Sequence, residues 1–189
     1  MPALHGKTSP RASSKAARRR SGRAAATLAI SLACFIFWGS VGACSPSHFD
    51  GQVFRKGDVS FRLEHLPPSW RRIEIDDTAL AFRDDENAAT VAINGRCGKD
   101  AEDVPLASLT QHLFLQFTER QLTHQEVFPL DGREALRTEM VAKLDGVQKY
   151  FHVVVLKKDG CVYDFLQIAN QHQDENVFLD FVRGFSKQT

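Results

Sequence analysis

Hydrophobic and polar residues alternate along the chain from about residue 58 onward. Val59, Phe61 and Leu63 are separated by polar residues, and a Pro-Pro break follows before Trp70. The stretches ALAFRDD and ATVAINGRC continue the alternation on either side of the acidic turn at residues 84–87. A period of two is typical of half-buried strands. The pattern therefore predicts that this part of the chain begins as an antiparallel β meander.

Helical spacing replaces the alternation in two places. After Pro105, apolar residues recur every three or four positions, at Leu106, Leu109, Leu113 and Phe117. A polar pair, Glu119-Arg120, follows them. Near the end of the chain, Asp174 or a neighbour is a suitable N-cap for a second such series: Val177, Phe178, Phe181, Val182 and Phe185. One-sided apolar spacing of this kind indicates amphipathic helices. The sequence predicts one helix over residues 106–117 and another at the C-terminus.

Three Asp-Gly pairs divide the region between these helices. Asp131-Gly132, Asp145-Gly146 and Asp159-Gly160 follow one another at intervals of 14 residues. Asp-Gly is a strong signal for a two-residue hairpin turn, in which both residues take a positive φ. The spacing predicts long antiparallel strands joined by tight hairpins.

The hairpin turns determine which residues face each other across the strands. Counting outward from the second and third turns gives a set of apolar pairs on one face: Leu144–Val147, Met140–Phe151, Leu136–Val155, Val153–Leu166 and Phe151–Ile168. Val154–Phe165 and Leu156–Tyr163 occupy the other face. A sheet that is apolar on both sides needs cover on both sides, and two helices are available. The predicted fold is therefore α+β, a three-layer α/β/α sandwich with a central antiparallel sheet.

The N-terminal region has the pattern of an export signal. Seven basic residues and no acidic residue precede an uncharged run, AAATLAISLACFIFW at residues 24–38. This run would form a helix of about 22 Å, which is short beside the roughly 20 residues of a membrane span. Val41-Gly42-Ala43-Cys44 then resembles the lipobox of bacterial lipoproteins. An ordinary signal peptide, an uncleaved anchor and a start site further downstream remain alternatives.

The lipobox resemblance implies cleavage before Cys44 and acylation of its thiol and new amine, with diacylglycerol and a palmitate-type chain. Ser45 stands where an Asp would favour the inner membrane, so the resemblance implies the periplasmic side of the outer membrane, with the inner membrane as the alternative. The expected organisation is a signal peptide at 1–43, a lipidated N-terminus and tether at 44–57, and one domain at 58–189.

Removal of the leader changes the charge balance. Seven of the 24 basic residues lie before Cys44 and all 23 acidic residues lie after it, which leaves a net charge of −6. Nucleic acid is therefore a poor partner, because phosphate binding needs a basic surface. Two cysteines remain in the body of the chain, Cys97 and Cys161, and each is next to a glycine. In an oxidising compartment a disulfide between them is favoured over two buried thiols or a metal pair.

Several packing motifs resemble the PsbP-like fold: LPPSW at an early strand, PLDGREAL, GCVYDFLQIA and FLDFVRGF. The resemblance covers about Asp58 to Ser186. That family includes the extrinsic photosystem II protein, a nuclear-import factor that binds Ran, and many bacterial lipoproteins. Because its members bind unrelated partners, the resemblance implies the fold and not the function.

The chemistry-bearing residues do not form a recognisable catalytic pattern. The chain has no phosphate-binding loop, HExxH motif or paired carboxylates of the usual spacing. The acidic turn Asp84-Asp85-Glu86 and the segment 98–103 are the best candidates for a partner-binding surface, with a weak calcium site as the alternative. Asp164 is the odd polar position on an apolar face, for which a carboxylate bonded to backbone at the end of the sheet is favoured over a catalytic acid.

Two functional hypotheses follow from these observations. In the first, the protein is a lipid-anchored, periplasm-facing envelope lipoprotein that acts as a non-catalytic binding or assembly module. It would be a monomer without cofactor or metal, held to the membrane by the lipid on Cys44, with an envelope protein as partner. In the second, it is an enzyme with a site near His152, Asp164 and Gln167, since the hairpin register places His152 opposite Gln167.

Overall fold

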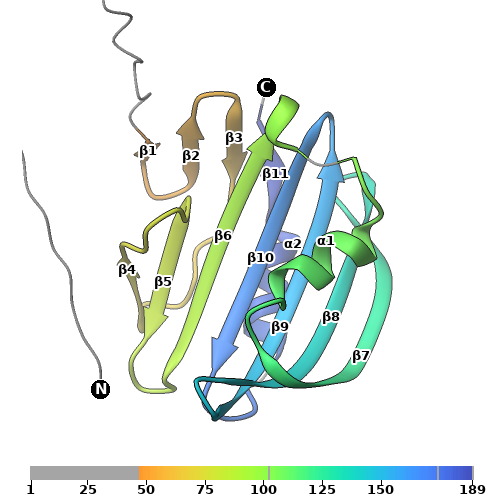
Figure 1. Ribbon diagram of the computed structural model, residues 1–189. Helices are drawn as coiled ribbons and strands as arrows, with labels where there is room; N and C mark the ends of the chain where they lie inside the picture. Colours follow the sequence, from red (N-terminus) through yellow and green to blue (C-terminus); the bar gives the residue numbers. More distant parts are fainter. Residues whose placement is uncertain (1–46, 102, 174, 189) are drawn as a thin grey trace, which may run out of the picture. The chain divides into compact units, whose positions relative to one another are not determined.

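A seven-stranded antiparallel sheet is the centre of the domain (Figure 1). The computed structural model describes residues 47–188 except 102 and 174. The strand order is β4-β5-β6-β10-β9-β8-β7. In chain order the strands are β4 (Trp70–Ile73), β5 (Leu80–Asp84), β6 (Ala89–Cys97), β7 (Thr118–Leu130), β8 (Arg133–Leu144), β9 (Val147–Lys158) and β10 (Cys161–Ala169).

The three Asp-Gly pairs close tight hairpins, as the sequence predicts. Both residues of each pair have a positive φ, for example 50° at Asp145 and 79° at Gly146. The registers also agree with the count from the turns: Leu144 pairs with Val147, Lys158 with Cys161, and His152 with Gln167. Since residues directly opposite each other share a face, the predicted facing of β8, β9 and β10 is confirmed.

The segment before residue 58 belongs to the domain. A second sheet has the order β1-β2-β3-β11, with β1 (His48–Phe49), β2 (Val53–Lys56), β3 (Val59–Arg62) and β11 (Ser186–Lys187). Phe54 in β2 is buried and stacks on Phe61 at 5.1 Å between ring centroids. The structure therefore corrects two expectations: residues 48–56 are not a free tether, and β3 is not the first strand of the meander.

Two α-helices and one short 3-10 helix complete the domain: α1 (Leu106–Leu113), α2 (Glu175–Arg183) and η1 (Gly98–Asp100). Helix α1 ends one turn before the predicted Phe117, and Glu119 and Arg120 lie in β7. Glu119 has a φ of 48°, and the β7–β8 register shifts nearby. The proposed N-cap Asp174 lies outside the described residues.

The core has two halves, one on each face of the large sheet. On one face α1 packs Leu109 against β9, with Phe114 and Phe117 around Phe151. On the other face, α2 and the small sheet enclose an aromatic cluster that includes Phe61, Tyr163 and Phe185. A Cβ on Gly95 would lie 2.6 Å from Val59, so a glycine there allows β3 to approach β6.

The layering departs from the predicted helix–sheet–helix arrangement. The protein is a mostly antiparallel β structure with two α-helices, and Figure 1 shows α1 in front of the large sheet and α2 behind it. On the α2 face, however, the four-stranded sheet shares the cover with the helix. The two-residue strands and the polar β7 gave no alternation from which this sheet-rich arrangement could be predicted.

Candidate functional site

The acidic turn between β5 and β6 has a buried carboxylate at its start. Asp84 is only 3% exposed. Its Oδ1 accepts hydrogen bonds from the backbone N–H groups of Glu86 (3.1 Å) and Asn87 (3.3 Å), and its Oδ2 accepts one from Asn87 Nδ2 (2.7 Å). Asp side chains stabilise turns in this way. Asp84, which the sequence offered as a partner-binding residue, is thus bonded within its own turn and presents little surface.

Asp85 and Glu86 remain exposed in this turn, but Asp85 is already paired. Its Oδ2 accepts a hydrogen bond from Arg71 Nε at 2.7 Å, and its Oδ1 one from Arg83 Nε at 3.3 Å. The hydrogen bond from Arg71 is the main reason that the pKa of Asp85 is lowered. Two arginines thus offset most of the negative charge that made this turn a candidate docking surface.

The second acidic segment, residues 98–103, lies at the opposite end of β6. Nine residues of strand separate the two segments, or about 30 Å. Asp103 pairs with Lys157 Nζ at 2.6 Å, which lowers the pKa of Asp103. The two segments therefore do not form one surface. Across the described residues, no group of three or more His, Cys, Asp or Glu side chains is placed to hold a metal ion.

The three residues of the enzyme hypothesis do not come together. His152 and Gln167 face each other on β9 and β10 and point toward the α2 side of the sheet, as do Val154 and Phe165. Asp164 pairs with Val155, which belongs to the core on the α1 side. Because neighbouring positions of a strand point to opposite faces, the sheet itself separates Asp164 from His152.

Asp164 is instead held by an arginine. Its carboxylate is 2% exposed and accepts a hydrogen bond from Arg96 Nη1 on the neighbouring strand β6. The Asp164 carboxylate thus forms a cross-strand ion pair, which the sequence did not predict. Breaking such a pair would leave a charge buried without its counter-ion, so this arrangement is structural.

A polar row crosses the α2 side of the sheet from β7 to β10. Arg137 Nη1 donates to Glu126 Oε1 at 2.9 Å, and Arg137 Nη2 donates to Glu139. Glu139 pairs in register with His152, which pairs with Gln167. His152 is 4% exposed, and the rings of His172 and Phe178 lie 6.3 and 6.1 Å from its own. Burial is the main reason that the pKa of His152 is lowered.

His152 and Gln167 are buried members of this row. Within the described part of the chain, neither His152 Nδ1 nor Gln167 Oε1 has a hydrogen-bond partner, although both are buried. Because His152 is buried, a molecule would have to enter the core to exchange a proton with its imidazole. Neither recess described below is lined by His152 or Gln167.

Cys97 and Cys161 form the predicted disulfide. They pair directly across β6 and β10, with their Cα atoms 4.1 Å apart. The bond closes a sequence separation of 64 residues and joins the end of the meander to the start of β10. It replaces the alternatives of free buried thiols or a metal pair.

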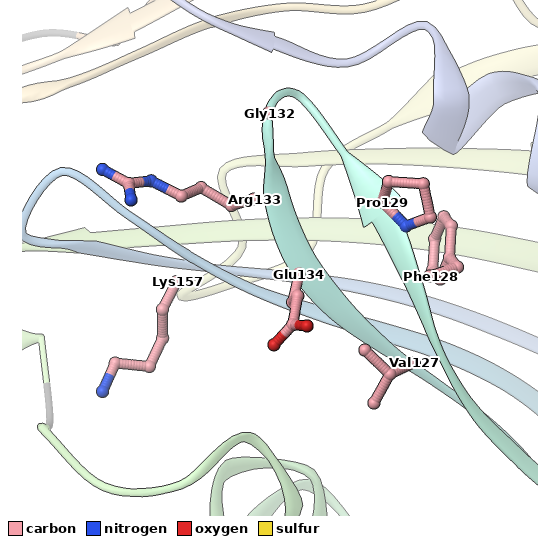
Figure 2. Close-up of a pocket in the computed structure, with 7 residues that line it drawn as sticks. All are labelled: Val127, Phe128, Pro129, Gly132, Arg133, Glu134 and Lys157. Atoms are coloured by element: carbon pink, nitrogen blue, oxygen red, sulfur yellow. The ribbon is translucent and has the colours of Figure 1, made fainter.

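One recess lies at the tip of the β7–β8 hairpin and has a volume of about 690 Å³. Figure 2 shows Glu134 and Lys157 projecting toward the same side, with Val127 nearby. Both cations of this recess are already paired: Lys157 with Asp103, and Arg133 with Asp159 at 3.4 Å. Glu134 is the carboxylate of this recess, so the recess offers a ligand one acidic group beside two cations that already have partners.

A more apolar groove lies between α1 and the adjacent strands β7 and β8. Its volume is about 490 Å³, and it is lined by Ala107, Thr110, Gln111, Phe114, Leu115, Arg120, Leu122, Gln125, Thr138 and Met140. Leu115 and Leu122 are large apolar side chains that are 73% and 54% exposed. Sequence reasoning missed this site, although the apolar Leu122 and Val127 within the polar strand β7 were visible signals.

The predicted lipidation site, Cys44, and the whole leader lie outside the described residues. In the part of the chain that the structure does describe, none of the helices has the length and apolar character needed to span a membrane.

Comparison with known proteins places the fold. No family model and no curated protein sequence matches this chain. Among solved structures, cyanobacterial PsbP (CyanoP) from Synechocystis superposes with a TM-score of 0.52 at 15% identity, over 79% of this chain and 96% of the other. The domain has a PsbP-like fold.

Two further structures are similar. A protein from Bacteroides thetaiotaomicron gives a TM-score of 0.53 at 9% identity, and the match covers 75% of this chain but only half of the other. LpqN, which is involved in cell envelope biogenesis of Mycobacterium tuberculosis, gives a TM-score of 0.46 at 15% identity, over 69% of this chain and 86% of the other. At 9% identity, the likeness to the Bacteroides protein shows a similar fold alone.

Proposed function

We propose that this chain is a lipid-anchored envelope lipoprotein that faces the periplasm and acts as a non-catalytic binding or assembly module. The observation that supports a binding role is the exposed apolar groove between α1 and β7. Water-exposed apolar side chains that gather beside a recess are typical of interaction sites. The buried and separated positions of His152 and Asp164 favour this class over an enzyme.

The cellular location rests on the sequence of the leader and on the disulfide. A basic, then apolar leader that ends in Val41-Gly42-Ala43-Cys44 is typical of exported lipoproteins. The Cys97–Cys161 bond is consistent with an oxidising compartment such as the periplasm. Ser45 favours the outer membrane over the inner membrane, and several acyl chains at about 0.8 kcal/mol per buried CH₂ would make release negligible.

The anchor is tested by mass spectrometry of the mature N-terminus. We expect residue 44 to be the first residue and to carry diacylglycerol and an amide-linked acyl chain such as palmitate. Cys44→Ala should leave the uncleaved precursor in the membrane fraction, and density-gradient separation should place the wild type with the outer membrane. An unmodified Cys44 in the mature protein would contradict the anchor.

The binding role is tested by cross-linking in intact cells that express the full chain. We expect a discrete cross-linked species of higher mass in the wild type and, at the same yield, in His152→Gln. A purified protein that turns over a substrate, and loses that activity in His152→Gln, would instead support an enzyme.

A further inference from the structure

Strand β7 is a long, exposed edge of the large sheet. It has 13 residues, and in the described part of the chain no strand pairs with its outer side. The opposite edge, β4, has only four residues. Of the β7 side chains, only Phe128 and Leu130 are not exposed. A long open edge presents unpaired backbone groups, to which another strand can add.

The hairpin register shows which backbone groups of β7 point outward. Leu130 and Arg133 flank the Asp131-Gly132 turn and exchange hydrogen bonds, so inward and outward residues alternate from there. The N–H and C=O groups of Gln125 and Val127 therefore face away from β8, whereas those of Glu126 face β8. The register is regular from His124 to Leu130 and shifts only before His124.

The side chains of the same two residues lie on the α1 side of the sheet. Gln125 lines the apolar groove and donates to Thr138 Oγ1 at 3.0 Å, and Val127 is 57% exposed. Residues of an added strand opposite Gln125 and Val127 would share this face. Apolar side chains at those two positions would cover Val127 and enter the groove beside Leu122.

The residue between these two positions would lie on the other face, next to Glu126. The Glu126 side chain is about half exposed and pairs with Arg137 and, at 3.6 Å, with His124 Nε2. Glu126 and Glu139 share the one guanidinium of Arg137, which leaves a net negative charge, so a basic residue of the added strand would be favoured there. In the register that pairs Gln125 with Val127, a second copy of this chain would place Glu126 opposite Glu126, and like charges directly opposite are destabilising.

We propose that β7 binds an extended segment of a partner protein as an eighth strand, and that this segment has an apolar–basic–apolar pattern opposite Val127, Glu126 and Gln125. The backbone of the segment would bond to the outward groups of Gln125 and Val127, and its two apolar side chains would occupy the α1 side. This inference rests on the proposed binding function and gives that function a surface and a class of partner.

The test in solution uses two fluorescein-labelled peptides, STVKVTS and STVEVTS, and the detergent-solubilised full chain. We expect the lysine peptide to bind at least about fivefold more tightly, and Glu126→Gln to bring this ratio close to one. Val127→Pro removes one outward N–H from an edge that already contains Pro129, so it should fold and bind the lysine peptide at least about tenfold more weakly.

Val147→Asp is the matched control, because Val147 is 56% exposed but lies at a different hairpin. This variant should bind the lysine peptide like the wild type, and circular dichroism should show that all variants are folded. Equal binding of the two peptides by the wild type, or undiminished binding by a folded Val127→Pro variant, would overturn the inference.

A test in cells separates this inference from the proposed function. A photo-cross-linking amino acid replaces Gln125 in one full-length variant and the exposed Gln148 in another. We expect adducts at position 125 whose sequenced peptide contains an apolar–basic–apolar segment. Adducts only at position 148 would overturn the inference and leave the binding function standing, whereas the absence of adducts at both positions would contradict both.

Discussion

Three buried charged side chains of this domain have partners within it. Asp84 caps a turn, Asp164 pairs with Arg96, and Arg137 joins Glu126 to Glu139. Tyr163 is buried among aromatic rings, and this burial raises its pKa to about 12. At the residue scale, substitutions of these side chains should therefore change the stability of the domain.

Asp84→Ala should destabilise the domain. The substitution removes the acceptor for three hydrogen bonds within the turn, and hydrogen bonds to a charged group contribute about 1.5–3 kcal/mol. Urea denaturation should show a decrease of that size in the free energy of unfolding. Glu86→Ala, in the same turn but exposed, is the control and should change it by less than about 0.5 kcal/mol.

His152 should make the domain less stable in mild acid. Its folded-state pKa is lowered below 6.5, mainly by burial, with Arg137 and His172 also lowering it and Glu139 opposing. The unfolded chain therefore binds the proton more readily, so stability is complete above pH 6.5 and falls as the pH drops below that value. The slope approaches about 1.4 kcal/mol per pH unit for one proton.

The measurement is the free energy of unfolding between pH 7.5 and 5.5. His152→Gln should show a smaller decrease over this range than the wild type, whatever its stability at pH 7.5. His48→Gln, an exposed residue, should follow the wild-type profile. Parallel profiles for the wild type and His152→Gln would contradict the assignment.

At the element scale, local signals predicted more than distant ones. The registers of β8, β9 and β10 follow from counting outward from two Asp-Gly turns, because a two-residue turn fixes its own strand pairing. The pairing of β11 with β3 has no such signal, since two-residue strands show no periodicity and lie far apart in the sequence. The Asp131-Gly132 turn predicts a strand before it, but the extent of β7 was not predicted, because nearly all of this strand is exposed and it has no apolar alternation.

At the candidate site, too, some features could be predicted from the sequence and others could not. The predicted register already separated Asp164 from His152. It placed His152 opposite Gln167, and Gln167 is three positions from Asp164 on β10, so the two side chains point to opposite faces. The burial of Asp84 was not available, since Asp-Asp-Glu-Asn in a turn is typical of solvated loops. Only the structure showed that the first of these carboxylates turns inward to bond its own turn.

The disulfide should contribute measurably to stability because it links two strands that are distant in sequence. Closing a loop of 64 residues constrains the unfolded chain by about 4 kcal/mol on the chain-entropy model. The double variant Cys97→Ala and Cys161→Ala should lose up to that amount in urea denaturation. Unreduced wild-type protein should resist alkylation at both positions under denaturing conditions, and label only after reduction.

At the scale of the whole molecule, segments near the two ends of the described chain complete the same core. Phe54 in β2 stacks on Phe61, which also contacts Phe185 just after α2, with ring centroids 5.7 Å apart. Phe54→Ala should therefore cost about 3–5 kcal/mol, as expected for a buried phenylalanine. Thermal unfolding checks this, with the exposed Arg55→Ala as control. An unchanged midpoint for Phe54→Ala would mean that this segment is a tether after all.

The pairing of β3 with β11 also has a consequence for when the chain can fold. Phe178, Phe181, Val182 and Phe185 are made after every strand of the large sheet, yet they cover strands from the first half of the domain. A chain synthesised from its N-terminus would therefore keep this face of the sheet uncovered until residues 178–185 have left the ribosome. The aromatic core on this face can close only after that point in synthesis.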